Sequence, residues 1–361
     1  EIYTLSLHDA LPISPNGGNN SGIKERVTIY VVAQAADVSL ATVSRVINHR
    51  PNVTKETREK VEAAIARLGY RPSALAQGLA RSKTTNIGIL MPDNFYVYTS
   101  NMLNGMVKVA KTYGYQADLF VTGPNQSDAM KTIEKLISSH VDGAVIYDDQ
   151  LSTDEIMTIQ NYKIPLIIIG HEMKGNALGS IVMDYKTALI SYLTKHFNEN
   201  TAEDIVFLKS EGDGILMEDL RESVANFCKD KNMKFSTLDI IDSYSRLYEE
   251  KMGEFIEQNG KKGHFFIAAR DSLAAAICNY CTDNGISVPE DNEVMSIIGT
   301  KYSSICRPQI SSMDLDMAWV GQIAMRMVTK LLGDGLAEEN KVWRFSTKVI
   351  ERNSTKKNSS K

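Results

Sequence analysis

The sequence of 361 residues lacks several features that mark particular classes of protein. It has four cysteines, too few for a disulfide scaffold in a chain of this size, so we expect a reducing compartment, the cytoplasm. No apolar run approaches ~18 residues, so a transmembrane helix is not expected. The N-terminus also lacks the basic segment and apolar core of a secretory signal.

Patterns typical of enzymes and metal sites are missing as well. There is no G-x-S-x-G, no H-E-x-x-H and no phosphate-binding glycine loop, and the six histidines do not cluster. Cys278 and Cys281 have the spacing of zinc ligands, but no second pair lies near them, so we interpret both as core residues. The sequence therefore predicts neither catalysis nor a metal or other cofactor.

The first 23 residues differ in composition from the rest. The run EIYTLSLHDALPIS resembles translated sequencing-adapter sequence, and the PNGGNN that follows is typical of a disordered segment. We interpret residues 1–23 as a disordered or artefactual extension and exclude them from the predicted fold. A genuine flexible tail is the alternative.

The charge of the chain is unevenly divided. From Lys24 to Lys83 there are eleven basic and five acidic residues, a net charge of +6. Glu1 and Asp9 precede this segment, so with an overall charge of −4 the remainder of the chain carries −8. A basic module of about 60 residues joined to an acidic body is typical of a protein that binds nucleic acid at one end.

Within the basic module, apolar spacing predicts three short helices. The first spans about 29–36 after a threonine that can cap it, and the second spans 40–48 with Ser39 as its N-cap. The third, 55–68, follows the cap Thr54 and ends at a glycine. The first two helices and their tight turn form a helix-turn-helix, whose second helix enters the DNA major groove.

The second helix carries the side chains that would read DNA. Its outward positions are Leu40, Ala41, Ser44 and Arg45. Arg45 is the long donor of this set, and we expect it to reach guanine O6 and N7. Short hydroxyl side chains suit phosphate contacts, which position the protein without specifying sequence: Ser39, Thr42 and Ser44.

The run VTIYVVAQAADVSLATVSRVINHRPNVTKETREKVEAAIARLGYRP resembles the DNA-binding head of the lactose-repressor (LacI/GalR) family. The resemblance implies a hinge helix at 73–80, in which Leu79 wedges into the minor groove at a central base step; a plain linker is the alternative. Val31 stands where the family usually has Asp, at a cost of ~0.5 kcal/mol to the first helix, and DNA binding is not expected to be lost. The predicted DNA contacts are Thr28, Ser39, Leu40, Ala41, Thr42, Ser44, Arg45, Asn48, Thr54, Thr57, Tyr70, Ala76 and Leu79.

From Asn86 onward, apolar runs alternate with amphipathic segments. Strands are predicted at 87–91, 119–121, 144–147, 166–169, 205–208, 237–241, 265–267 and 294–298. Helices are predicted at 102–113, 128–139, 154–162, 186–197, 220–231, 247–259, 271–283 and 317–332. Such alternation indicates doubly wound parallel sheets, and the number of strands favours two of them. The predicted fold is an all-α helix-turn-helix head plus an α/β core of two doubly wound parallel-sheet subdomains.

This core resembles the regulatory core of the same family, which is similar to periplasmic sugar-binding proteins. The resemblance rests on runs such as SSHVDGAVI, RPQISSMDLDM and VIERNST, which occur in the family's order. The predicted division of the chain is a DNA-binding domain at 24–70, a hinge and linker at 71–85, a core at 86–356 and a tail at 357–361. Within the core, the N-subdomain comprises about 86–184 and 313–342, and the C-subdomain about 185–312 and 343–356.

The predicted effector cleft departs from the family's sugar-binding pattern. Ligands in such folds bind at the carboxyl ends of strands, here between the subdomains. Arg270-Asp271 stands where sugar-binding members have Asn-Asp, and Lys301 stands where a second Asp usually follows. Two cations favour a phosphorylated or acidic effector; a neutral sugar, or no small ligand with Lys301 solvated or paired with Asp271, are the alternatives. The candidate effector-binding residues are Tyr96, Tyr98, Met183, Arg221, Arg270, Asp271 and Lys301.

Together these patterns predict a sequence-specific DNA-binding transcription regulator, a repressor, that binds a pseudo-palindromic operator as a homodimer. A sugar or sugar phosphate is the expected effector class, a phosphocarrier protein is left open as a further partner, and no membrane is expected. The alternative is a solute-binding protein of the periplasmic type without a regulatory role. The basic head and the lack of a signal segment argue against that alternative.

Overall fold

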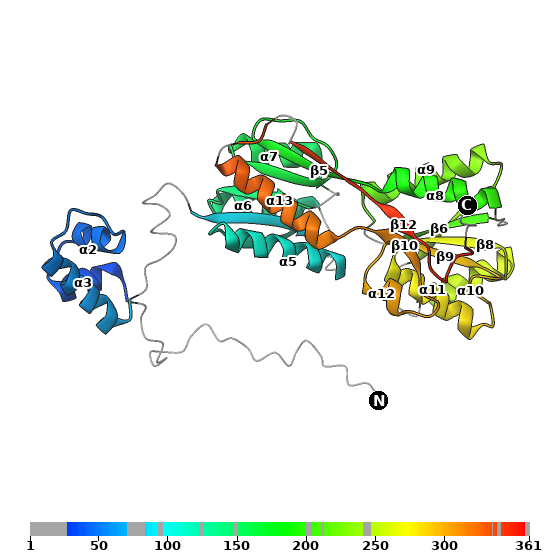
Figure 1. Cartoon of the computed structure of the whole chain (residues 1–361), viewed down its shortest axis with the longest axis horizontal. Coiled ribbons are helices and arrows are strands. Elements are labelled where there is room, and N and C mark those ends of the chain that lie inside the picture. The colour runs from blue at the N-terminus through cyan, green and yellow to red at the C-terminus, as the bar shows by residue number, and fades with distance from the viewer. Residues whose placement is uncertain are drawn as a thin grey trace. The chain divides into compact units, whose positions relative to one another are not determined.

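The chain forms two compact units, Glu1–Ser82 and Lys83–Lys361, and each is described by itself. A computed structural model describes most of both (Figure 1). The described residues are 27–70, 84–92, 97–122, 126–147, 151–199, 204–210, 213–240, 247–333, 335–337 and 341–357.

The first unit contains a small three-helix head around a valine core. Its helices are α1 (Ile29–Ala36), α2 (Leu40–Ile47) and α3 (Lys55–Leu68). Val32, Val43 and Val61, one from each helix, are completely buried and hold the three helices together. The predicted helix-turn-helix is therefore confirmed, with α2 as its second helix.

Capping residues set the ends of these helices. The Ser39 and Thr54 hydroxyls accept N–H bonds from Thr42 at 3.2 Å and from Thr57 at 3.3 Å, as expected for N-caps. Thr28 occupies the N-cap position of α1, but its side chain makes no capping hydrogen bond. Gly69 ends α3 at a φ of 63°, a left-handed conformation that glycine adopts without strain.

The first subdomain of the second unit is built on a six-stranded, all-parallel sheet in the order β11-β5-β4-β3-β1-β2. Its strands are β1 (Asn86–Pro92), β2 (Gln116–Thr122), β3 (Gly143–Ile146), β4 (Leu166–Gly170), β5 (Leu178–Asp184) and β11 (Val342–Ser346). The helices α5 (Val97–Thr112) and α13 (Met317–Leu332) cover one face, and α6 (Gln126–Ser138) and α7 (Thr153–Asn161) cover the other.

Two glycines allow α5 and α13 to pack with their backbones almost in contact. A Cβ placed on Gly105 would lie 2.1 Å from the Ala318 carbonyl oxygen, and one on Gly321 would lie 2.0 Å from that of Met102. Any larger residue at either position would push the helices apart. Glycine at these two positions thus allows α5 and α13 to pack closely as the helical layer on one face of the first sheet.

The second subdomain repeats the architecture, with strands in the order β12-β10-β9-β8-β6-β7. Its strands are β6 (Asp204–Ser210), β7 (Lys234–Ile240), β8 (His264–Arg270), β9 (Glu293–Ile298), β10 (Ser311–Asp314) and β12 (Lys348–Ile350). Its helices are α8 (Tyr185–Glu199), α9 (Ile215–Asp230), α10 (Leu247–Asn259), α11 (Asp271–Asp283) and α12 (Lys301–Ile305). The two-sheet prediction is confirmed, except that β12 pairs antiparallel with β10, so the second sheet is not entirely parallel.

The chain passes three times between the two sheets. It crosses after β5, between β10 and α13, and between β11 and β12, where Thr347 is the single linking residue (Figure 1). All of β10 lies in the second sheet, and all of β11 lies in the first. The predicted subdomain boundaries at 312/313 and 342/343 therefore cut through these two strands.

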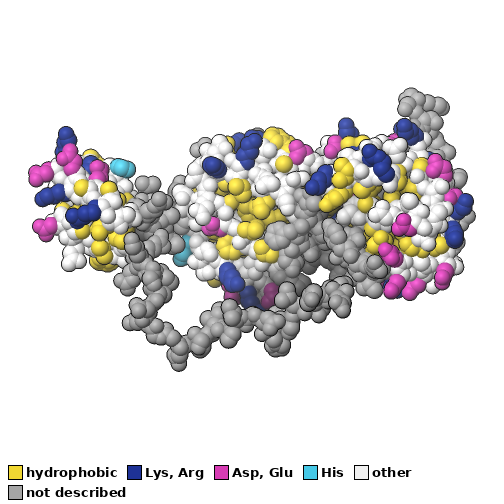
Figure 2. Space-filling model, turned by 90° about the horizontal axis from the view of Figure 1, so that it is seen from below, with side chains coloured by type: hydrophobic (Ala, Val, Ile, Leu, Met, Phe, Trp, Pro, Cys, Tyr) yellow, Lys and Arg dark blue, Asp and Glu magenta, His cyan; other side chains and the backbone are white. Residues whose placement is uncertain are grey.

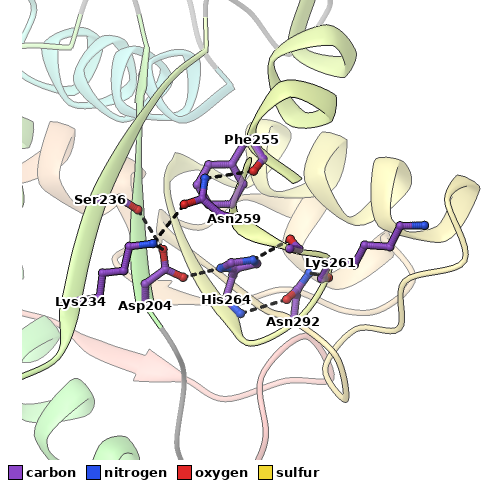
Figure 3. Close-up of polar contacts among 9 residues, drawn as sticks. Asp204, Lys234, Ser236, Phe255, Asn259, Lys261, His264 and Asn292 are labelled. Atoms are coloured by element: carbon purple, nitrogen blue, oxygen red, sulfur yellow. Dashed lines mark hydrogen bonds and ion pairs between the residues drawn. The ribbon is translucent and has the colours of Figure 1, made fainter. Parts of the chain in front are cut away.

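Buried polar groups tie the amino ends of the strands in the second sheet (Figure 3). The His264 ring, at the start of β8, contacts the Asp204 carboxylate of β6 through Nδ1 and the Gly260 carbonyl through Nε2 at 3.0 Å. Asp204 also accepts a bond from the Ser236 hydroxyl at 3.0 Å. His264 and Asp204 are almost completely buried, so this edge is held by internal polar contacts, as buried polar groups require.

Within the described residues, none of the helices has the length and apolar character needed to cross a bilayer.

Candidate DNA-reading helix and effector cleft

The outward face of α2 matches the face predicted from the sequence. Leu40, Ala41 and Arg45 are exposed and Ser44 is half-buried, while Val43 and Val46 are buried against the rest of the head. Ala41 and Arg45 are four residues apart, so their side chains lie on one side of the helix one turn apart. The exposed guanidinium thus has Ala41 on its side of the helix, whereas Leu40 is exposed at the first position of α2, five residues before Arg45.

Several hydroxyl and amide groups around α2 already contact one another. The Ser39 and Thr42 hydroxyls are 2.8 Å apart, and Asn48 Nδ2 donates to the Ser44 carbonyl at 2.9 Å. The Thr54 and Thr57 hydroxyls form a similar pair at 2.8 Å. A hydroxyl can donate once and accept twice, so these groups retain capacity for phosphate oxygens.

The remaining predicted DNA contacts divide into described and undescribed residues. Thr28 is exposed at the start of α1, and Tyr70 is half-buried just after α3. Ala76 and Leu79 lie outside the described residues, so the hinge stays a prediction.

In the described part of the head, the ion pair is that of Lys55 with Glu59, at 3.9 Å. It is exposed and therefore contributes little to stability. Arg45 takes no part in it, and its charge therefore remains available for an anionic partner.

Two of the predicted effector residues, Arg270 and Asp271, lie at the carboxyl end of β8. Asp271, the first residue of α11, is 1% exposed, and its carboxylate accepts bonds from Thr300 N at 2.6 Å and Ser303 N at 3.0 Å. The Thr300 and Ser303 hydroxyls also donate to Asp271, at 2.9 and 2.8 Å. Asp271 therefore holds the first turn of α12 against α11.

This carboxylate belongs to a longer buried chain of hydrogen bonds. The Ser312 hydroxyl of β10 donates to the Ser303 hydroxyl at 3.2 Å, and Arg352 Nη1 donates to the Ser312 hydroxyl at 2.8 Å. Burial lowers the pKa of Arg352, while the charges of Asp314 and Asp271 oppose that shift. The sequence shows Arg352 only as part of the closing run VIERNST, and its bond to Ser312 was not predicted.

Arg270, at the end of β8, points to a different set of partners. Its side chain is buried, and Nη1 donates to the Ser210 hydroxyl at 3.3 Å. Ser210 in turn donates to Asp213 from its N–H at 2.8 Å and from its hydroxyl at 2.9 Å. Burial raises the pKa of Asp213, and the bonds from Ser210 and the charge of Arg270 partly offset this. Sequence reasoning missed Ser210 and Asp213, although both lie within five residues of the end of the predicted strand 205–208.

The other effector candidates do not join this cluster. Lys301 is exposed at the start of α12, with its ammonium 5.7 Å from the Tyr302 ring centre, and no ion pair with Asp271 forms. Arg221 Nη2 pairs with Glu218 at 2.8 Å, and the bonds from Arg221 and Lys209 lower the pKa of Glu218.

The candidates of the first subdomain are only partly described. Met183 is buried in β5, where the Tyr185 hydroxyl contacts its sulfur at 3.9 Å. Tyr96 and the side chain of Tyr98 lie outside the described residues.

No group of three or more His, Cys, Asp or Glu side chains is arranged to hold a metal in the described part of the chain. Cys278 and Cys281 are buried in α11, and burial raises the pKa of Cys281 to about 11. Such thiols are poor nucleophiles and poor metal ligands at neutral pH.

A helix-turn-helix head joined to a core of two α/β subdomains defines a class of DNA-binding transcription regulators. Residues 28–73 match the model of bacterial regulatory proteins of the lacI family, and residues 194–355 match a periplasmic binding protein-like domain. Catabolite control protein A of Staphylococcus epidermidis is 31% identical over 309 residues, covering 85% of this chain and 93% of that protein. The chain therefore belongs to the LacI family of transcription regulators.

Solved structures share the fold. The lac repressor dimer bound to operator and the anti-inducer ONPF has a TM-score of 0.74 at 20% identity, covering 92% of this chain and 99% of that one. The complex of transcriptional regulator CelR with cellobiose has a TM-score of 0.63 at 20% identity, covering 91% and 100%. Two short runs, Arg307-Pro308-Gln309 and Ala324-Met325-Arg326, also resemble catabolite control protein A, in agreement with this match.

Proposed function

We propose that this regulator represses transcription by binding a pseudo-palindromic operator through α2 of two identical chains. The observation that carries the proposal is the outward surface of α2, which exposes Arg45 with Ala41 one turn before it, and Leu40 at the start of the helix. Arg45 would donate to guanine O6 and N7, and the two apolar side chains would contact thymine methyl groups. The hydroxyls of Ser39, Thr42, Ser44, Thr54 and Thr57 would contact phosphates, together with Thr28, Asn48 and Tyr70.

Selection of duplexes from a random DNA library by the full chain tests this function. Two inverted half-sites should emerge, each with a G·C pair and neighbouring A·T pairs, since Arg45 and the apolar side chains are four and five residues apart on one short helix. Absence of any enriched sequence, with weak binding to all duplexes, would contradict sequence-specific regulation. It would favour a solute-binding role instead.

We also propose the domain division 24–70, 71–85 and 86–356, in which the hinge at 71–85 folds on DNA. Ala76 and Leu79 would lie in the minor groove, with Leu79 as an apolar wedge that bends the duplex. A Leu79→Ala variant should bend operator DNA less and bind it more weakly while its core stays folded. An unchanged bend angle would remove the wedge from the proposal.

The proposed dimer uses the edge of the first sheet. Four large apolar side chains are exposed on or next to α5 and β2: Val107, Tyr113, Leu119 and Val121. Hydrophobic side chains also gather on the face of the first subdomain seen in Figure 2. An exposed apolar edge strand is costly in a monomer, because its unpaired backbone groups and side chains invite association. The related lac repressor is a dimer on its operator, which makes a second copy of this chain the proposed partner.

The second sheet supplies a control for this interface. The edge strand β7 has the same place as β2, and Thr237 occupies the position that Leu119 has in β2. Leu119→Asp should produce monomers in sedimentation and weaken operator binding, whereas Thr237→Asp should leave the dimer intact. Equal behaviour of the two variants would place the interface elsewhere.

For the effector we propose an anionic ligand, a sugar phosphate or acid, near Arg270 and Lys301. The positive charge of Arg270 is partly balanced by Asp213, while Lys301 is exposed. Calorimetric titration of the full chain with a hexose and its phosphate tests this choice. Tighter binding of the phosphate, and its loss in Lys301→Asp, is expected; tighter binding of the hexose would contradict the proposal.

The location and the further partners of the chain are also part of the proposal. We propose that the chain acts in the cytoplasm on DNA and catalyses no reaction, in line with the regulators to which it is related. A phosphocarrier protein remains a candidate partner; if neither the hexose nor its phosphate binds, that protein becomes the next ligand to titrate.

A further inference from the structure

The side chain of Arg58, in α3, donates hydrogen bonds at the C-terminal end of α2. Arg58 Nη2 donates to the Arg50 carbonyl at 2.9 Å, and Nη1 reaches the Val46 carbonyl at 3.5 Å. Val46 lies in the last turn of α2, directly after Arg45. The Arg58 backbone N–H also bonds the Thr54 carbonyl at 3.0 Å, so this residue contacts both ends of the segment that joins α2 to α3.

The end of α2 needs such a contact for physical reasons. A helix of eight residues is too short to be stable alone. Its last carbonyls accept backbone bonds from the segment that follows: Asn48 N–H bonds Ser44, His49 N–H bonds Val46 and Arg50 N–H bonds Arg45. His49, two residues beyond α2, has a φ of 52°, a left-handed conformation that non-glycine residues adopt at a cost. Arg58 adds a donor from another helix to this end of α2, and its charge also interacts favourably with the helix dipole.

The positions of the two carbonyls suit an arginine side chain, and no carboxylate pairs with Arg58 in the described part of the head. A guanidinium presents donors in a planar fork, so one side chain can reach two carbonyls four residues apart, which a lysine ammonium cannot do with the same geometry. In the described part of the head, the ion pair is Lys55 with Glu59 and does not involve Arg58. Arg58 is half-buried, with its backbone one turn before the buried Val61.

We propose that Arg58 is a positioning residue for base recognition: by fixing the C-terminal end of α2, it sets where Arg45 reaches the operator. This inference rests on the proposed function, because it requires α2 to read DNA. It assigns to Arg58 no contact with DNA itself. Loss of the fork would let α2 shift on the head, which harms contacts that depend on direction far more than contacts with phosphates.

The experiment uses the full chain, the selected operator duplex and a scrambled duplex of equal length. Arg58→Met keeps much of the apolar stem and removes every donor, and Arg58→Lys keeps the charge. For Arg58→Met, operator affinity should fall roughly tenfold or more, the scale of hydrogen bonds from a charged group, while affinity for the scrambled duplex changes less than about threefold. Arg58→Lys should recover part of the loss.

A double-mutant cycle with Arg45→Ala links the two residues. If Arg58 acts through Arg45, the combined variant should bind the operator little more weakly than Arg45→Ala alone. Additive losses would contradict the proposal. So would equal losses on both duplexes with a salt dependence reduced by about one charge, since that is the behaviour of a phosphate contact.

Folding and function are separated by two controls. Circular dichroism at the assay temperature reports whether the head of each variant is folded; if Arg58→Met unfolds it, the Arg58→Lys comparison decides, and full operator affinity in that variant would overturn the role of the fork. A wild-type chain that prefers no duplex would contradict the proposed function. A wild-type chain with a clear preference that both Arg58 variants share would contradict this inference alone.

Discussion

The outward face of α2 and the carboxyl edge of the second sheet each carry an arginine and several hydroxyl groups, yet they differ in what these polar side chains contact. On α2, Arg45 extends into solvent, and the neighbouring hydroxyls form single short pairs. At the sheet edge, Asp271 accepts bonds from two residues of another segment, and Arg270 is buried against Ser210. The first surface is prepared for a partner, whereas the second is largely engaged with itself.

The difference shows when a residue at a position that is functional in related proteins can be expected to keep that function. At an exposed position such as Arg45, nothing in the fold competes with the ligand, so the side chain can keep its role. At a buried position such as Asp271, the partners decide the role, and here the partners are Thr300 and Ser303. The same residue type can then stabilise the fold instead of binding an effector.

The largest expected effect concerns Asp271. Replacing Asp271 by Asn places donors opposite the N–H groups of Thr300 and Ser303, so the free energy of unfolding of the core should fall by about 2–4 kcal/mol. Denaturant unfolding measures this loss. The control is Asp283→Asn, at the exposed other end of α11, which should change stability by less than ~0.5 kcal/mol. If Asp271→Asn is equally harmless, the carboxylate is not a structural group and an effector role returns.

The second prediction concerns Arg45. Its removal in Arg45→Ala should cost about 1–3 kcal/mol of binding to the selected operator and much less on a scrambled duplex. Arg67→Ala, an exposed arginine in the last turn of α3, should affect both duplexes alike. Fluorescence anisotropy titrations provide the affinities. An equal loss on both duplexes for Arg45→Ala would reduce it to a phosphate contact.

A smaller effect separates two threonines of the head. Thr54 accepts a capping bond from Thr57 N–H, whereas Thr28 caps α1 by position without a side-chain bond. Thr54→Ala should therefore lower the stability of the head by about 1 kcal/mol, and Thr28→Ala by distinctly less. Thermal unfolding of the two variants followed by circular dichroism compares them. Equal losses would mean that the bond of Thr54 contributes nothing.

The smallest effect is a pH dependence that arises from the Asp213 carboxyl group. Because the folded pKa of Asp213 is raised above 3.8, the folded core binds a proton more tightly than the unfolded chain does. Its contribution to stability should decline as pH rises from 3.8 through the folded pKa. Comparing the unfolding free energies of the wild type and Asp213→Asn across that range isolates this slope. Parallel curves for the two proteins would show that Asp213 titrates normally.

The head and most of the core could be predicted because their signals are local. The α3 helix shows its cap at Thr54, its apolar spacing and its terminating Gly69 within 16 residues of sequence, and the structure places its ends there. Long apolar runs likewise identified β4, β6 and β8. In each case the residues themselves supply the hydrogen bonds or the burial that define the element.

The missed elements depend on partners far away in the chain. Ser311 and Ser312 form the buried strand β10, although neither residue is apolar. The Ser311 hydroxyl lies 2.7 Å from that of Thr355, and the Ser312 hydroxyl accepts from Arg352. Polar residues can be buried when distant residues satisfy them, and local spacing carries no sign of this. The internal contacts of Asp271 escaped prediction for the same reason.

The most direct measurement is the affinity of the full chain for its selected operator and for a scrambled duplex, each over a range of salt concentrations. The account predicts that the operator binds ~10³-fold or more tightly and that both affinities fall as salt rises. It also predicts that one duplex binds two chains. Equal affinities for the two duplexes, or binding that is insensitive to salt, would contradict the assignment of α2 as a reader of DNA sequence.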